Sequence, residues 1–178
     1  MTRIINFFGA PGSGKTTAAA EAFVRIKKKG YSAHLVQEYA TELIMQGKAE
    51  QVKDQKKLFE EQLRRIGIAN DKVDFIVVDS PLLLNVVYDR YRKGSSNNSF
   101  EKNVVDAHKN FEQTNILLKY DSKNYTSKGR VTTSQESFVI EQKIKDVLKE
   151  TKTPFVEISS FDELENNFNS IIEKGVKK

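Results

Sequence analysis

The chain has 178 residues, of which 38% are hydrophobic and 30% charged, and its formal net charge is +5. This length and composition are typical of a single globular domain and exclude a disordered or fibrous chain. Cysteine is absent, which excludes disulfides, thiolate metal sites and thiol nucleophiles. No apolar run approaches the roughly 18 residues of a membrane span, so we expect a cytoplasmic protein without a membrane partner.

The first part of the chain alternates between apolar strands and amphipathic helices. Ile4 to Phe8 is an apolar run that indicates a buried strand. Helical spacing continues from about Lys15 to Lys29, and Gly30 follows where helices commonly end. A second strand is predicted for Ala33 to Gln37, and a short helix for about Thr41 to Met45.

The middle of the chain repeats this alternation. Apolar residues at helical spacing predict one long helix from about Glu50 to Ala69. The run FIVVD, residues 75–79, is typical of a parallel strand covered on both faces. Pro81 is expected to begin the next helix, a further helix covers about Phe100 to Phe111, and Ile116 to Lys119 predicts a fourth strand.

Two helix starts are marked in the last third of the chain. Thr133 to Glu136 and Ser160 to Glu163 both match the capping box, in which a hydroxyl and a glutamate satisfy free backbone donors. Phe155 to Ile158 lies between them and predicts a fifth strand. Repeated strand–helix units favour parallel pairing with right-handed crossovers. We therefore expect one three-layer α/β domain over residues 1–178, with a five-stranded parallel sheet.

The segment GAPGSGKTT, residues 9–17, joins the first strand to the first helix and contains the P-loop pattern G-x-x-x-x-G-K-[ST]. Glycines let backbone N–H groups turn inward as a nest for phosphate oxygens, and the helix points its positive dipole end there. Lys15 is expected to bridge the β- and γ-phosphates, and the Thr16 hydroxyl to bind Mg²⁺. We therefore expect a P-loop NTPase or kinase domain that uses ATP and Mg²⁺. The predicted nucleotide-binding residues are Gly9, Pro11, Gly12, Ser13, Gly14, Lys15, Thr16 and Thr17.

The acid that ends the third strand indicates which class of P-loop protein this is. Asp79 occupies the place of a Walker B aspartate, which organises the metal ion; capping of the helix after Pro81 is the alternative. Ser80 follows it, where motor ATPases carry a glutamate that activates water. Guanine-recognition motifs are also absent. Phosphoryl transfer to an acceptor is the interpretation that remains.

Such a kinase needs a base for its acceptor, positive charge for the transition state and a means to exclude water. Glu38 closes the second strand at the edge where doubly wound sheets bind ligands, and is a candidate base, with Asp79 as its rival. A surface or capping role is the alternative for Glu38. The long polar connection of residues 120–136 predicts a lid loop, from which Arg130 folds over the γ-phosphate unless the loop is only a solvated surface.

Several motifs together resemble a P-loop kinase family. They are GAPGSGKTT, the EYA after the second strand, a helix with DQ and Q, VDSPLLL, and KGR before the last long helix. The pattern is similar to the kinase domain of the bacterial NAD regulator, which phosphorylates nicotinamide riboside. It is more similar to small phage-encoded AAA-like ATP-binding proteins, some of which resemble kinases of 5-hydroxymethyluracil in DNA. A phage-encoded protein would act in the host cytoplasm.

The resemblance implies phosphate binding by the P-loop, metal or base duty for Asp79 and a lid role for Arg130. It further implies acceptor contacts for Glu38 and Tyr39. Gln55 and Gln62 either face the acceptor or are solvated helix residues. The aromatic base-stacking arrangement of the nicotinamide-riboside enzymes has no counterpart here, so their substrate does not carry over.

Three hypotheses stay open for what this protein does with the bound nucleotide. If the acceptor is DNA, the surplus positive charge should form a groove, with backbone contacts from Lys56, Lys57, Arg64 and Arg65. If the acceptor is a free nucleoside or nucleotide, a closed pocket under the lid suffices. A regulatory protein that hydrolyses ATP slowly and has no acceptor is the third hypothesis.

Overall fold

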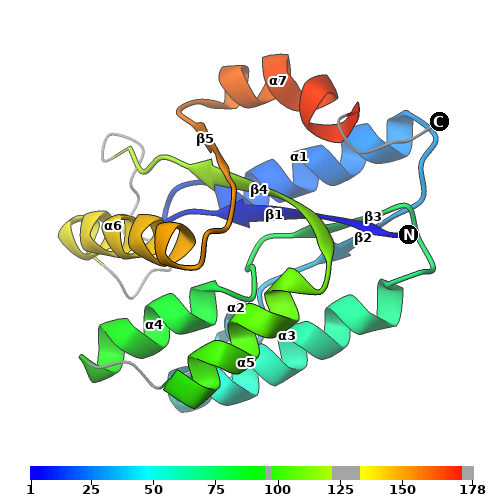
Figure 1. Cartoon of the computed structure of the whole chain (residues 1–178). Helices are drawn as coiled ribbons and strands as arrows, with labels where there is room; N and C mark the ends of the chain where they lie inside the picture. Colours follow the sequence, from blue (N-terminus) through cyan, green and yellow to red (C-terminus); the bar gives the residue numbers. More distant parts are fainter. Residues whose placement is uncertain (95–97, 122–132, 174–178) are drawn as a thin grey trace.

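The computed structural model describes residues 1–94, 98–121 and 133–173, with side chains described through residue 171. Its centre is a parallel five-stranded sheet in the order β2-β3-β1-β4-β5 (Figure 1). The strands are β1 (Arg3–Phe8), β2 (Ala33–Val36), β3 (Phe75–Val78), β4 (Glu112–Leu118) and β5 (Val156–Ile158). The predicted three-layer α/β fold with five parallel strands is therefore confirmed.

Helices cover both faces of this sheet. They are α1 (Lys15–Lys28), α2 (Tyr39–Met45), α3 (Gln55–Ala69), α4 (Leu84–Lys93), α5 (Asn98–Lys109), α6 (Ser134–Glu150) and α7 (Phe161–Glu173), with a 3₁₀ helix η1 (Ala49–Lys53). Figure 1 shows α1 and α7 on one face and α3, α4, α5 and α6 on the other. No helix among the described residues is long and apolar enough to span a membrane.

The alternating side chains of β1 divide the interior into two cores. Ile5 and Phe7 face α1 and α7 and pack with Ile26, whereas Ile4 and Phe8 face the other helices. All four of these strand residues are almost fully buried, because a central parallel strand is covered on both sides. The central strand therefore carries the P-loop that follows it on a rigid base.

Two buried asparagines fix the register between β1 and β4. Asn6 lies opposite Asn115 and donates to its Oδ1 atom at 2.9 Å, and Asn115 in turn donates to the carbonyl of Pro154 at 3.0 Å. A shift in register would leave these amides buried without partners, which is costly. The pair thus holds β4 in place beside the strand that leads into the P-loop.

Some predicted boundaries differ from the structure for tertiary reasons. The single helix predicted from Glu50 is two elements, because the Asp54 side chain accepts from the Lys57 backbone N–H at 3.0 Å and starts α3 anew. The helix after Pro81 begins at Leu84. β4 begins at Glu112 instead of Ile116, since its polar first residues pair with β1.

The two predicted capping boxes differ in detail. The Thr133 hydroxyl accepts from the Glu136 N–H at 3.2 Å, and the Glu136 carboxylate accepts from the Thr133 N–H at 2.7 Å, as predicted. At the second helix Ser160 accepts from the Glu163 N–H at 3.1 Å, but the Glu163 carboxylate accepts from Ser159, one residue earlier than expected.

The packing of α1 on the sheet can be tested with a buried and an exposed residue of the same helix. Replacement of fully buried Ile26 by alanine removes apolar contacts and leaves a cavity, which should lower the free energy of unfolding by about 2–5 kcal/mol. Val24→Ala, at a position that is 47% exposed, should change it by no more than about 0.5 kcal/mol. Urea denaturation measures both, and equal losses would contradict the assigned packing.

Candidate active site

The P-loop bends sharply between β1 and α1, and two of its glycines are required by the surrounding structure. Gly9 has a φ of 156°, and a Cβ atom there would lie 2.2 Å from the Ser13 Oγ atom. Gly14 has a φ of 86°, and a Cβ atom would lie 2.9 Å from the Phe161 ring. A side chain at either position would displace the Ser13 side chain or the Phe161 ring and would strain the backbone at its positive φ. The close turn is what brings successive backbone N–H groups together as a phosphate nest.

The first turn of α1 is left open toward this loop. Gly14 is its N-cap and supplies no side-chain cap, and the first turn contains no acidic residue. The N–H groups at the start of the helix and the positive end of its dipole therefore face the loop without a competing carboxylate from that turn. This is the electrostatic condition for binding a phosphate group.

The Lys15 ammonium lies over the backbone of the P-loop itself. It donates to the carbonyl oxygens of Gly9 and Ala10 at 2.9 and 3.0 Å. Both acceptors are neutral, so a phosphate oxygen would attract the ammonium more strongly than they do. Lys15 thus lies beside the loop, and its predicted contact to the β- and γ-phosphates stays a prediction.

Asp79 lies directly after β3 and is only 3% exposed. Burial and the nearby Glu38 carboxylate raise the pKa of Asp79 to about 6, while the Thr16 hydroxyl and Lys15 ammonium oppose this rise. Among the described residues, its Oδ1 atom is buried without a hydrogen-bond partner. A buried, partly charged carboxylate with an unpaired oxygen favours the approach of a cation.

The donor set around Asp79 fits Mg²⁺. A carboxylate oxygen and the Thr16 hydroxyl are hard oxygen ligands, which this ion prefers. Within the described ranges, no group of three acidic or histidine side chains could bind a metal by itself. Mg²⁺ usually keeps waters and binds through one or two protein oxygens together with substrate phosphates, so this small set is appropriate.

Glu38 lies two residues after the end of β2 and is the N-cap residue of α2, where its side chain makes no capping hydrogen bond. Its half-buried carboxylate accepts from the Thr41 hydroxyl at 2.9 Å, which orients it. It lies close enough to Asp79 and Tyr88 to raise the pKa of both groups. The structure therefore brings together Lys15, Thr16, Asp79 and Glu38, because parallel strands place their carboxyl ends at one edge.

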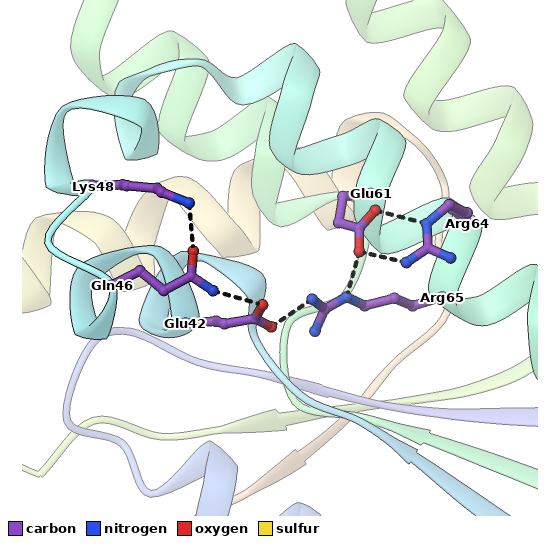
Figure 2. Close-up of polar contacts among 6 residues, drawn as sticks. All are labelled: Glu42, Gln46, Lys48, Glu61, Arg64 and Arg65. Carbon is purple, nitrogen blue, oxygen red and sulfur yellow. Dashed lines mark hydrogen bonds and ion pairs between the residues drawn. The ribbon is translucent and has the colours of Figure 1, made fainter.

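Tyr39, the residue after Glu38, contacts a network of charged and polar residues between α2 and α3. The Arg65 guanidinium lies over the Tyr39 ring, 4.8 Å from its centroid, and binds Glu42 at 2.5 Å and Glu61 at 2.8 Å. Figure 2 shows how Glu61 also binds Arg64, and how Glu42 continues the network to Gln46 and Lys48. Arg64 and Arg65 lower the pKa of Glu61 to about 2. The network fixes α2, and with it Glu38, against α3.

The four basic residues predicted to contact DNA are therefore engaged within the protein. Arg64 and Arg65 bind carboxylates, as Figure 2 shows, and Lys56 forms a 3.9 Å ion pair with Glu60. The Lys57 ammonium donates to the Gln51 side chain at 2.6 Å. Of these four cations, the two arginines are thus paired closely with carboxylates, Lys56 is paired weakly, and Lys57 contacts a neutral group.

The two glutamines of α3 are not solvated. Gln55 is 4% and Gln62 is 3% exposed. The Gln55 amide donates to the Val52 carbonyl at 3.0 Å, and the Gln62 Nε2 atom is buried without a partner among the described residues. Solvation, one of their two predicted alternatives, is thus wrong, while an acceptor contact stays a prediction.

Two residues of α4 near Glu38 were missed by the sequence analysis. Burial and the Glu38 carboxylate raise the pKa of the Tyr88 hydroxyl above its usual range, and the Arg92 guanidinium opposes the rise. The two residues are four apart and share one face of α4. This spacing was the available signal, but it only gains meaning once α4 is known to lie beside the end of β2.

The remaining surroundings of the P-loop are described in part. Arg130 and most of the predicted lid, residues 122–132, lie outside the described residues. Where the lid begins and ends, a cavity of about 710 Å³ is lined by Lys119, Tyr120, Asp121, Ser134, Gln135, Phe138, Val139 and Ser159. A cavity of about 840 Å³ follows the outer face of α1 from Thr16 to Lys28 and does not include Asp79. The first cavity, with the exposed Phe138 ring, offers an apolar surface for a nucleobase.

A family model described as an AAA domain matches residues 4–165. The chain belongs to this AAA domain family. Comparison with curated proteins found no match. The solved structure of YorR from Bacillus subtilis, in complex with phosphorylated GDP, is similar: it is 18% identical, the alignment covers 96% of this chain and 95% of that one, and the TM-score is 0.64. Family and fold together show a P-loop NTPase-like, nucleotide-binding domain.

The electrostatics of Asp79 predict a pH-dependent stability. Its pKa of about 6 in the folded protein exceeds the value of about 3.9 in an unfolded chain, so the folded state binds the proton more tightly. The free energy of unfolding should therefore fall as pH rises from about 4 to about 6. Asp79→Asn should raise it by about 2–3 kcal/mol at pH 7 and have little effect near pH 4.

Urea denaturation at the two pH values in the presence of a chelator measures this difference. Asp106→Asn on α5, whose carboxylate is exposed and bound to Lys102, is the matched control and should show no such pH dependence. A gain for Asp79→Asn that is the same at both pH values would disprove the assignment.

Proposed function

We propose that this protein is an ATP- and Mg²⁺-dependent kinase that transfers the γ-phosphate to a hydroxyl group of a nucleotide-type acceptor. The observation that carries the proposal is the meeting of two carboxylates beside the P-loop: Asp79 next to Thr16, and Glu38 next to Asp79. One carboxylate suffices to organise a metal ion. The second is then available to an acceptor.

Each residue of the site has a separate role in the proposed phosphoryl transfer. Loop N–H groups hold the phosphates, and Lys15 exchanges the carbonyls of Gly9 and Ala10 for phosphate oxygens. Thr16 and Asp79 would hold Mg²⁺, which neutralises charge on the phosphate oxygens when it is bound. Arg130, from the expected lid, would add positive charge over the γ-phosphate.

Glu38 suits the role of base better than Asp79. Asp79 is almost fully buried against Thr16, whereas Glu38 is half-buried and is oriented by Thr41. In the transfer step, the acceptor oxygen forms a bond to the γ-phosphorus while the bond from phosphorus to the ADP oxygen breaks. The proton of the acceptor hydroxyl passes to the Glu38 carboxylate.

A free nucleotide or nucleoside is favoured over DNA as the acceptor. Binding along a DNA backbone needs several uncompensated cations, and Arg64 and Arg65 of α3 are each paired with carboxylates. The complex of YorR with phosphorylated GDP supports a nucleotide as ligand for this fold.

A transfer assay with labelled ATP tests the proposed kinase. The acceptors are nucleosides, nucleoside monophosphates, 5′-hydroxyl oligonucleotides and hydroxymethylated DNA. Wild-type protein should label one acceptor class, and Lys15→Ala should abolish the transfer, because the β- and γ-phosphates lose their cation. Lys28→Ala, at the exposed far end of α1, is the control and should be fully active. If no acceptor accelerates ADP release, the kinase proposal is wrong, and the hypothesis of a regulatory protein that hydrolyses ATP slowly is favoured instead.

Arg130 is expected to act in the transition state. Arg130→Ala should slow transfer by about 10³-fold or more, while the dissociation constant for ATP, measured by calorimetry, changes little. Lys102→Ala, an exposed residue of α5, should change neither quantity. Equal losses in binding and in rate for Arg130→Ala would show that the arginine only binds ATP.

A further inference from the structure

The arginines of this chain differ in what they bind. Five of those in the described ranges form ion pairs with glutamates: Arg3, Arg25, Arg64, Arg65 and Arg90. Arg92 is exposed, and its Nη1 atom donates to a neutral group, the Val52 carbonyl, at 2.5 Å, while none of the described carboxylates forms an ion pair with it. Its charge is therefore not neutralised by a carboxylate there.

The position of Arg92 relates it to the candidate base. It lies on α4 one turn after Tyr88, on the same helix face. The Tyr88 hydroxyl interacts with both the Glu38 carboxylate and the Arg92 guanidinium. Tyr88 therefore lies near both an acid and a cation. The contact to the Val52 carbonyl of η1 holds the guanidinium in place.

Stabilisation of the C-terminus of α4 does not explain this arrangement. Cations are favoured at such a position, and Arg90, Arg92 and Lys93 all lie in the last turn. The other two, however, are paired, Arg90 with Glu101 and Glu150, and Lys93 with Asp89. Of these three residues, only Arg92, on the face of Tyr88, has a neutral contact. This difference points to an anionic ligand on that face.

We propose that Arg92 binds a phosphate group carried by the acceptor, so that the acceptor is a free nucleoside monophosphate whose reacting hydroxyl lies at Glu38. The proposal rests on the kinase function proposed above. A guanidinium has several donors in one plane and matches a phosphate, and the contact to Val52 uses only Nη1. One guanidinium without a carboxylate partner fits one phosphate, whereas a DNA backbone would need a row of such cations. The acceptor phosphate itself takes no part in bond formation.

The test compares Arg92→Gln with wild-type protein on each deoxynucleoside and its 5′-monophosphate. For the monophosphate, KM should rise about 10- to 100-fold, the effect of losing hydrogen bonds between charged groups. KM for the nucleoside should be unchanged, and Arg92→Lys should recover part of the loss. Lys93→Gln removes a positive charge from the next residue of the same helix and should leave both values unchanged.

Calorimetric titration of each monophosphate, with a non-hydrolysable ATP analogue present, separates this proposal from the kinase itself. Binding that depends on Arg92 without any transfer would support the phosphate contact and overturn the proposed kinase. Equal loss of nucleoside and monophosphate binding in Arg92→Gln would show a structural role and overturn the phosphate contact. If hydroxymethylated DNA is the only acceptor that receives the phosphate, the proposed free monophosphate acceptor is wrong, whether or not Arg92→Gln lowers the transfer rate.

Discussion

The unfavourable proximity of two carboxylates, buried Asp79 and half-buried Glu38, is the constraint on which the rest of the site depends. The parallel sheet places both near adjacent strand ends, and the pKa of Asp79 rises because burial and the Glu38 carboxylate outweigh the opposing effects of the Thr16 hydroxyl and the Lys15 ammonium. A protein selected only for stability would remove such a charge. Its retention beside Thr16 and the open N-terminus of α1 makes sense when a cation and a polyphosphate are bound.

The features that could be predicted from sequence are those set by neighbouring residues. The apolar runs of β1 and β3 and the glycine pattern of the P-loop each have a local physical cause. The capping box at Thr133 does as well. A strand end followed by an acid also has a local signature, so Asp79 and Glu38 could be placed at the correct edge before their mutual distance was known.

The features that could not be predicted depend on partners distant in sequence. The polar start of β4 becomes a strand only because β1 lies beside it, and Arg3 binds Glu112 across that pairing. Arg65 resembles an exposed cation of α3 until α2 brings Glu42 against it. Tyr88 likewise gains its importance from Glu38, which lies fifty positions earlier in the chain.

The net charge of +5 has a different meaning in the folded protein than in the sequence. In sequence, that surplus favours a polyanion and points to any cluster of lysines and arginines. In the structure, Arg64 and Arg65 of α3 are matched by Glu61 of the same helix and Glu42 of α2, so the charge of this pair is satisfied internally. What attracts a ligand is an uncompensated charge in a defined place. By that criterion the single guanidinium of Arg92, one helical turn from the Tyr88 hydroxyl, is more informative about the acceptor than the whole basic surface.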